Sequence, residues 1–87
     1  MKPIVIYSTA SCPYCVAAKQ FLGRKGLAFD EIRVDLDPAR RAEMLARAAG
    51  RRTVPQIFIG DMHVGGYDDL VAADRAGRLD TLTGDST

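Results

Sequence analysis

The feature that most constrains the fold is the β-branched apolar run IVIY at residues 4–7, followed directly by a helical pattern. A short continuous run of this kind is typical of a strand that is buried on both faces. The apolar residues that then recur at helical spacing are Tyr14, Ala17, Ala18, Phe21 and Leu22. Gly23 and Gly26 mark the end of this helix. The chain therefore opens with a strand and a helix.

Residues 27–50 predict a second strand and a second helix. Apolar and charged residues alternate in DEIRVDLD (30–37), a pattern that predicts a strand with Ile32, Val34 and Leu36 against the core. Asp37 followed by Pro38 predicts a helix start, with the aspartate as cap and the proline in the first turn. We expect this helix to end at Gly50 and to pack through Ala42, Leu45, Ala46 and Ala49.

The rest of the chain predicts a hairpin and a third helix. Residues 56–59 (QIFI) and 62–64 (MHV) are separated by Gly60 and Asp61, which predicts two antiparallel strands. Two glycines and two acidic residues in GGYDDL then predict a bend and a helix start, and Gly77 predicts its end. After Gly77, we expect Leu79 and Leu82 to add one more helical turn that packs against the core.

Together these elements predict an α/β fold. The first two strands should be parallel, because the crossover between them contains a helix, and the hairpin adds antiparallel strands. We expect a four-stranded mixed sheet flanked by three or more helices. With 87 residues and 47% hydrophobic content, the chain suffices for one domain over residues 1–87, with a flexible tail at about 84–87.

The charge balance limits the partners that the protein can have. Twelve basic and eleven acidic side chains give a net charge of +1, so we expect no nucleic-acid partner and no membrane surface. The apolar stretch in the start MKPIVIYSTA is too short for a signal peptide. No apolar run in the sequence approaches the roughly 20 residues that a membrane-spanning helix needs. We expect a monomer in the cytoplasm.

Both cysteines of the chain, Cys12 and Cys15, follow the first strand with only Pro13 and Tyr14 between them. Ligand sites in such sheets lie at the carboxyl ends of the parallel strands, which places this pair at the expected site. The two sulfurs lie one helical turn apart and can form a disulfide. Cys12, at the positive end of the helix dipole, is the thiol whose anionic form is stabilised, whereas Cys15 lies inside the first turn.

Three other uses of the cysteine pair remain to be weighed. A structural disulfide is disfavoured, because cytoplasmic thiols are kept reduced and so short a loop adds little restraint. A zinc site needs two further ligands, and the chain offers no third cysteine and only His63, which we interpret as a surface residue of a strand. An iron–sulfur cluster shared by two copies needs one cysteine from each and stays open.

Three motifs in order, CPYC, TVPQIFI and GGYDDL, closely resemble those of the dithiol glutaredoxins, in particular the bacterial members of the glutaredoxin 3 type. The resemblance covers about residues 3–82. It implies a thioredoxin-like fold and glutathione as the reducing cosubstrate. We expect no metal, apart from the shared iron–sulfur cluster that stays open as an alternative. The implied partners are disulfide-containing or glutathionylated proteins, with ribonucleotide reductase as a common client of the family. The alternative enzyme, a thioredoxin-like donor recharged by a flavoprotein reductase, has no use for the GGYDDL motif.

The resemblance also implies roles for individual residues. Cys12 would attack the substrate disulfide and Cys15 would resolve the mixed disulfide. Pro55 would be cis, with the backbone of Val54 pairing with the cysteine of glutathione and Arg51 taking its glycine carboxylate. The complete set of implied glutathione-binding residues is Tyr14, Arg51, Thr53, Val54, Pro55, Gly66, Tyr67, Asp68 and Asp69.

Two positions depart from the family pattern. Many dithiol members carry a lysine shortly before the cysteines, where this chain has Thr9, so one cation is missing beside the thiol. Tyr67 stands where close relatives often have a further cysteine, which removes one route to side oxidation.

Overall fold

The structure, a computed structural model, describes residues 2–83. Within these residues four strands form one sheet: β1 (Ile4–Ser8), β2 (Asp30–Arg33), β3 (Gln56–Ile59) and β4 (Met62–Gly65). Their order is β2-β1-β3-β4, with β1 parallel to β2 and antiparallel to β3, and with β3 antiparallel to β4. The predicted mixed four-stranded sheet with a terminal hairpin is therefore confirmed.

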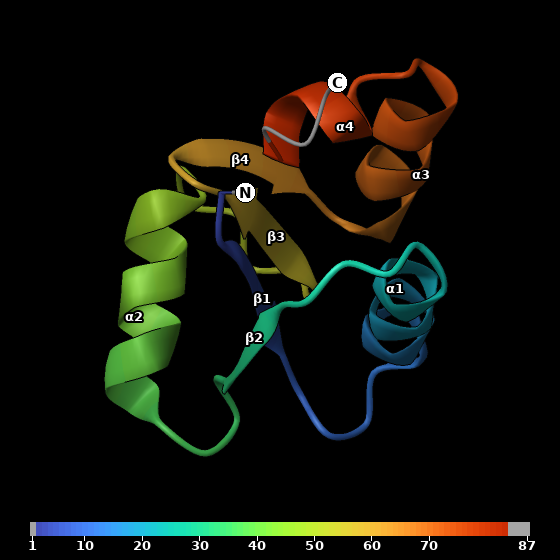
Figure 1. Ribbon diagram of the computed structural model, residues 1–87. Coiled ribbons are helices and arrows are strands. Elements are labelled where there is room, and N and C mark those ends of the chain that lie inside the picture. Colours follow the sequence, from blue (N-terminus) through green and yellow to red (C-terminus); the bar gives the residue numbers. More distant parts are fainter. Residues whose placement is uncertain (1, 84–87) are drawn as a thin grey trace.

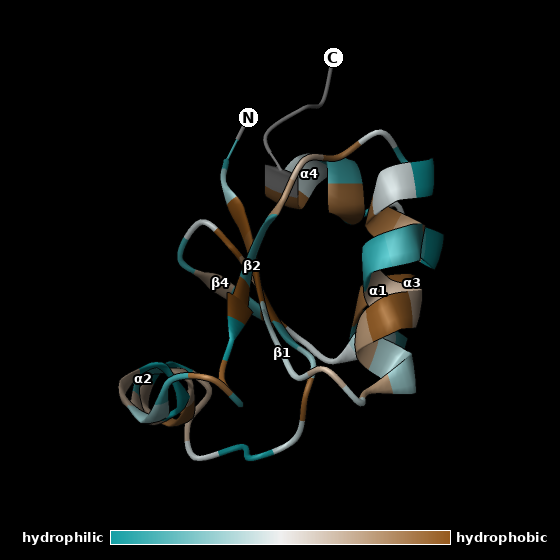
Figure 2. Ribbon diagram, turned by 90° about the horizontal axis from the view of Figure 1, so that it is seen from below, coloured by the Kyte–Doolittle hydropathy of each residue, from teal (hydrophilic) through white to brown (hydrophobic). Residues whose placement is uncertain are grey.

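In the described part of the chain, four helices cover the two faces of this sheet. They are α1 (Pro13–Arg24), α2 (Pro38–Arg47), α3 (Tyr67–Arg75) and the short α4 (Leu79–Thr83). In Figure 1, α2 lies alone on one side of the strands, whereas α1, α3 and α4 lie on the other. Figure 2 shows the same three layers from below, with hydrophobic segments along the strands in the middle. The α/β class is confirmed. The tail predicted at 84–87 lies outside the described residues.

The alternation of side chains along β1 and β3 builds a separate core on each face of the sheet. On the side of α1, α3 and α4, the buried cluster consists of Ile4, Ile6, Ala18, Leu22, Ile57, Ile59, Leu70 and Leu79. Because successive residues of a strand point to opposite faces, Tyr7 and Phe58 face α2 instead. There they pack with Val34, Met44 and Ala48.

Polar and aromatic contacts fasten α2 to its face of the sheet. The rings of Tyr7 and Phe58 meet edge to face with centroids 5.7 Å apart. The Arg47 guanidinium lies 4.1 Å from the Phe58 ring centroid and donates a hydrogen bond to the buried Tyr7 hydroxyl at 3.0 Å. That hydroxyl in turn donates to Glu43 of the same helix. A cation–π contact and a hydrogen-bonded hydroxyl thus hold α2 on its face of the sheet.

Two details of this region differ from the prediction. The second strand ends at Arg33, so Val34 is buried but Leu36 is 72% exposed, because the chain must turn there to begin α2 at Pro38. The predicted helix face is also wrong, since Met44 and Ala48 are the residues buried against the sheet. Of the residues predicted to form that face, Leu45 is half-buried, whereas Ala42, Ala46 and Ala49 are exposed. Alanine tolerates either environment, so its spacing does not determine which face packs.

Candidate active site

Cys12 is the N-cap of α1, where the local sequence fixes its surroundings. Its backbone is extended, and Pro13 follows in the first turn, where a missing N–H is tolerated. The Cys12 sulfur accepts a hydrogen bond from the backbone N–H of Cys15 at 3.1 Å. Both cysteines are free thiols, and Cys12 is 8% exposed whereas Cys15 is fully buried. A reagent therefore reaches Cys12 first.

The surroundings of Cys15 oppose its ionisation. Burial raises the pKa of the Cys15 thiol to about 12, and the side-chain hydrogen bond with Cys12 acts in the same direction. A backbone hydrogen bond with Thr9 and the charge of Lys19 oppose the increase in the pKa of Cys15 only in part. Cys15 is therefore protonated at neutral pH, and the two thiols of the pair are chemically unequal.

The loop before β3 brings Val54 against the first cysteine. The Cys12 thiol donates to the carbonyl oxygen of Val54 at 3.6 Å, across 42 residues of sequence. The Val54–Pro55 peptide bond is cis, as the family resemblance implies. In the thiolate form Cys12 loses its donated bond to Val54, but it can still accept from Cys15. The backbone of Val54 is thus placed beside the sulfur that would react.

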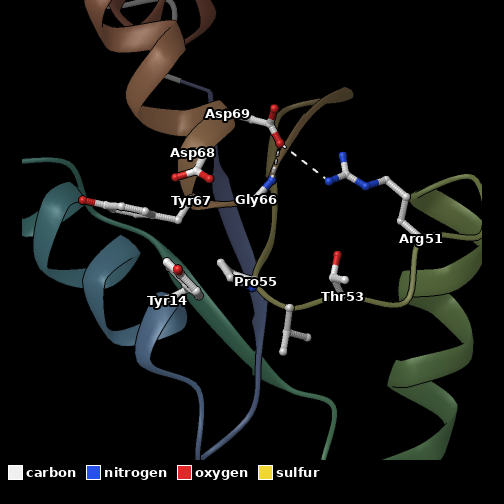
Figure 3. A pocket seen from close by; sticks show the side chains of 9 residues that line it. Tyr14, Arg51, Thr53, Pro55, Gly66, Tyr67, Asp68 and Asp69 are labelled. Carbon is white, nitrogen blue, oxygen red and sulfur yellow. Dashed lines mark hydrogen bonds and ion pairs between the residues drawn. The ribbon is translucent and has the colours of Figure 1, made fainter.

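A pocket of about 240 Å³ opens beside this contact, shown in Figure 3. It is lined by Tyr14, Arg51, Thr53, Val54, Pro55, Gly66, Tyr67, Asp68 and Asp69. These are the nine residues that the resemblance implies for glutathione, so the structure brings all of them together from α1, the loop before β3, and the start of α3. The aromatic side chains stand on one side of the pocket and Arg51 and Thr53 on the other.

The two ends of the pocket differ in character. Asp69, in the first turn of α3, accepts a hydrogen bond from the Gly66 N–H at 2.8 Å and lies 3.6 Å from the Arg51 guanidinium. Tyr14 and Tyr67 face each other in a tilted arrangement with ring centroids 6.2 Å apart. The pocket therefore offers a cation, two carboxylates with the N-terminus of a helix, and an aromatic wall.

The loop that carries Thr9 is held by charges on the neighbouring strand end. The Ala10 N–H donates to the Asp35 carboxylate at 3.2 Å, and Arg33 pairs with the same carboxylate at 2.6 Å. The Arg33 guanidinium holds the pKa of Asp35 well below its usual range. Neither Arg33 nor Asp35 was predicted for the site, because only the parallel pairing of β1 and β2 brings them to this loop.

Two further residues behind the pocket were missed. The fully buried Gln56 donates to the Thr53 carbonyl at 2.9 Å and contacts His63 Nε2 through Oε1 at 2.6 Å. His63 is half-buried and stacks on Phe58 with ring centroids 4.7 Å apart, so its interpretation as a surface residue is wrong. A glutamine in the otherwise apolar strand QIFI was the one sequence signal that pointed here.

Residues 2–83 contain neither a metal site nor a membrane-spanning helix. That part of the chain contains no group of three or more histidine, cysteine, aspartate or glutamate side chains placed to hold a metal ion. Nor does it contain a helix that is long and apolar enough to cross a membrane.

Comparison with known proteins identifies the family that this site resembles. The sequence profile of the glutaredoxin family matches residues 4–64. A glutaredoxin of Pseudomonas aeruginosa is 63% identical over 82 residues, which are 94% of this chain and 96% of the relative. Glutaredoxin 3 of Escherichia coli is 50% identical over 82 residues, with 94% and 98% covered. The crystal structure of a buckwheat glutaredoxin–glutathione complex is 32% identical and has a TM-score of 0.85, covering 97% of this chain and 78% of that one. The predicted thioredoxin-like fold is confirmed by this likeness.

Proposed function

The chain belongs to the glutaredoxin family of thiol–disulfide oxidoreductases, and we propose that it reduces protein disulfides and glutathione mixed disulfides with glutathione as the reductant. The observation that carries this proposal is the position of the nine-residue pocket, which adjoins the Cys12 thiol through Val54. A pocket of this chemistry is required by a glutathione-dependent enzyme and is superfluous for a donor recharged by a flavoprotein reductase.

The charges of the pocket suit the two ends of the tripeptide. We place the glycine carboxylate of glutathione at Arg51 and its cysteine beside the Val54 backbone, which offers an N–H and a C=O for a short β-like pairing. The γ-glutamyl carboxylate can accept from the N–H groups of Asp68 and Asp69 at the start of α3, while an aspartate carboxylate receives the amino group. In this arrangement Arg51 and Asp69 exchange their mutual ion pair for partners on the ligand.

The monothiol reaction uses Cys12 alone. The Cys12 thiolate attacks the glutathione sulfur of a mixed disulfide, a new sulfur–sulfur bond forms, and the substrate thiolate leaves and takes up a proton. A second glutathione, as its thiolate, then attacks the glutathione sulfur that is bound to Cys12. Oxidised glutathione departs, and Cys12 returns to the thiolate. The helix N-terminus stabilises Cys12 as the leaving group in this last step.

The dithiol reaction adds Cys15. Once Cys12 has attacked a protein disulfide, Cys15 loses its proton and attacks the Cys12 sulfur, which releases the second substrate thiol and leaves a Cys12–Cys15 disulfide. Two glutathione molecules reduce this disulfide in succession. Because Cys15 is buried and protonated in the resting protein, it must give up its proton before it can attack the Cys12 sulfur.

The test is turnover of a small glutathione mixed disulfide with glutathione, glutathione reductase and NADPH as the only reducing system. We expect turnover by the wild type and by Cys15→Ser, and none by Cys12→Ser. Reduction of a protein disulfide should be lost in both variants. If Cys12→Ser retained turnover, the assignment of the roles would be wrong. If the wild type turned over only with thioredoxin reductase, the chain would be a thioredoxin-like donor.

We further propose that the protein acts as a monomer in the cytoplasm, where thiols are kept reduced. Its substrates would be disulfide-containing or glutathionylated proteins, and ribonucleotide reductase is one candidate among them. Pull-down with Cys15→Ser, which retains the mixed disulfide with a substrate protein, identifies these clients directly.

A further inference from the structure

Gln56 is a fully buried polar side chain that the proposed reaction does not use. It is the first residue of β3 and follows Pro55. Its amide nitrogen donates to the carbonyl oxygen of Thr53 at 2.9 Å and contacts the Thr53 hydroxyl at 3.1 Å. Both bonds end on the loop that lines the pocket, so the side chain connects the sheet to the pocket wall.

The hydrogen-bonding pattern fixes the orientation of this amide. A carbonyl oxygen only accepts, so the Gln56 atom that faces the Thr53 carbonyl must be the NH₂ group. The Gln56 oxygen therefore points at His63 Nε2, at 2.6 Å, and can only accept from it. His63 must carry its proton on Nε2. The chain of donors thus runs from His63 through Gln56 to Thr53.

The position of His63 is set by packing rather than by this bond alone. It pairs with Phe58 in the register of β3 and β4, and the two rings are stacked 18° from parallel. The charged groups around it are Arg51 of the loop, Asp69 of α3 and Arg47 of α2. Burial, with the two arginines, lowers the pKa of His63, so the ring is neutral at neutral pH.

We propose that Gln56 and His63 are positioning residues, which hold the Thr53–Val54 backbone in the orientation that receives the cysteine of glutathione. This inference rests on the proposed function. Only the Nε2–H form of His63 fits the Gln56 oxygen, and only that amide orientation presents a donor to Thr53. Removing the His63 donor leaves a buried oxygen without a partner and allows the amide to turn, and the loop beside Cys12 loses its fixed geometry.

The predicted effect falls on substrate binding rather than on the chemical step. Neither side chain lines the pocket, and the hydrogen bonds of Cys12 go to Val54 and Cys15. The substitution His63→Phe retains a ring to stack on Phe58 but removes the donor. We expect it to raise the KM for the glutathione mixed disulfide about fivefold, as for loss of one hydrogen bond, with kcat close to that of the wild type. His63→Gln, which retains an N–H donor, should recover part of the loss.

The experiment compares wild type, His63→Phe and His63→Gln in turnover and in amide NMR spectra of the reduced proteins. We expect the Thr53 and Val54 amide signals to move in His63→Phe, with smaller changes in His63→Gln, and the wild-type ring to show the Nε2–H tautomer. Folded His63→Phe with an unchanged KM and unmoved Thr53 and Val54 signals would overturn the inference. If the wild type failed to use glutathione, the proposed function would fall, and the NMR comparison would still decide whether His63 positions this loop.

Discussion

Gly65 lies at the end of β4, and replacing it with alanine should damage the pocket and the fold together. Its φ of +115° is a conformation that side chains disfavour. A Cβ at Gly65 would also lie 2.8 Å from Cγ and 3.0 Å from Cβ of Asp69, and nearer still to its Oδ2. The Asp69 carboxylate would therefore have to leave the Gly66 N–H that it caps and the Arg51 side chain that it pairs with.

The magnitude follows from these two effects. Positive φ at a residue with a side chain costs about 1–2 kcal/mol. Loss of the capping hydrogen bond at the start of α3 costs about 1 kcal/mol. Gly65→Ala should therefore lower the free energy of unfolding by about 2–3 kcal/mol, which corresponds to a fall in Tm of roughly 10–20 °C for a domain of this size.

Gly77→Ala is the matched control. Gly77 also has a positive φ, +71°, but a Cβ there meets no heavy atom within 4 Å, so this variant reports the backbone cost alone. Thermal and urea unfolding give the two stabilities, and turnover of the glutathione mixed disulfide gives the KM. We expect Gly65→Ala to be less stable than Gly77→Ala and to have a raised KM, while Gly77→Ala keeps the wild-type KM. Equal stabilities and equal KM values for the two variants would refute the role given to Asp69.

Two further predictions concern ionisation. Because burial raises the pKa of Cys15 to about 12, iodoacetamide at pH 7.5 should modify the reduced, folded protein once, at Cys12. The urea-unfolded protein should be modified twice, and mass spectrometry counts the modifications. Two fast modifications of the folded protein would contradict this prediction. Hydrogen bonds from Lys19 and Ser8 lower the pKa of Glu31 below its ordinary value of 4.5, so the unfolded state binds more protons at acid pH than the folded state. The Glu31 carboxylate therefore contributes fully to the free energy of unfolding above pH 4.5. This contribution is lost as the pH falls through the pKa of Glu31 in the folded state. Urea unfolding between pH 6 and pH 3 should therefore show a shallower acid decrease for Glu31→Gln than for the wild type, and identical slopes would show that Glu31 contributes nothing.

The parts of the fold that depend on local chemistry were predictable from the sequence. The helix starts at Cys12–Pro13 and Asp37–Pro38 follow from cap and first-turn preferences, and each helix begins at the predicted proline. The strand IVIY was recognisable because both faces of it are covered, so it is apolar throughout.

Features that depend on tertiary contacts were not predictable in the same way. Leu36 continues the alternating pattern of a strand but lies on an exposed turn, because the connection to α2 decides where pairing stops. The buried bonds of Gln56 to Thr53 and His63 arise only when β3 and β4 pair, and no spacing in the sequence encodes them. For the pocket, the residues came from the family motifs, and the structure supplies their proximity.

The most direct test of the account is a map of where glutathione lies when it is bound to Cys12. The Cys15→Ser variant can be converted to its stable mixed disulfide with glutathione and compared with the reduced form by amide NMR. We expect the signals of Arg51, Val54 and residues 66–69 to move, because the tripeptide would extend along the pocket from Val54 to the start of α3. Changes confined to the first turn of α1 would contradict the account, because glutathione would then be attached to the sulfur without occupying the pocket.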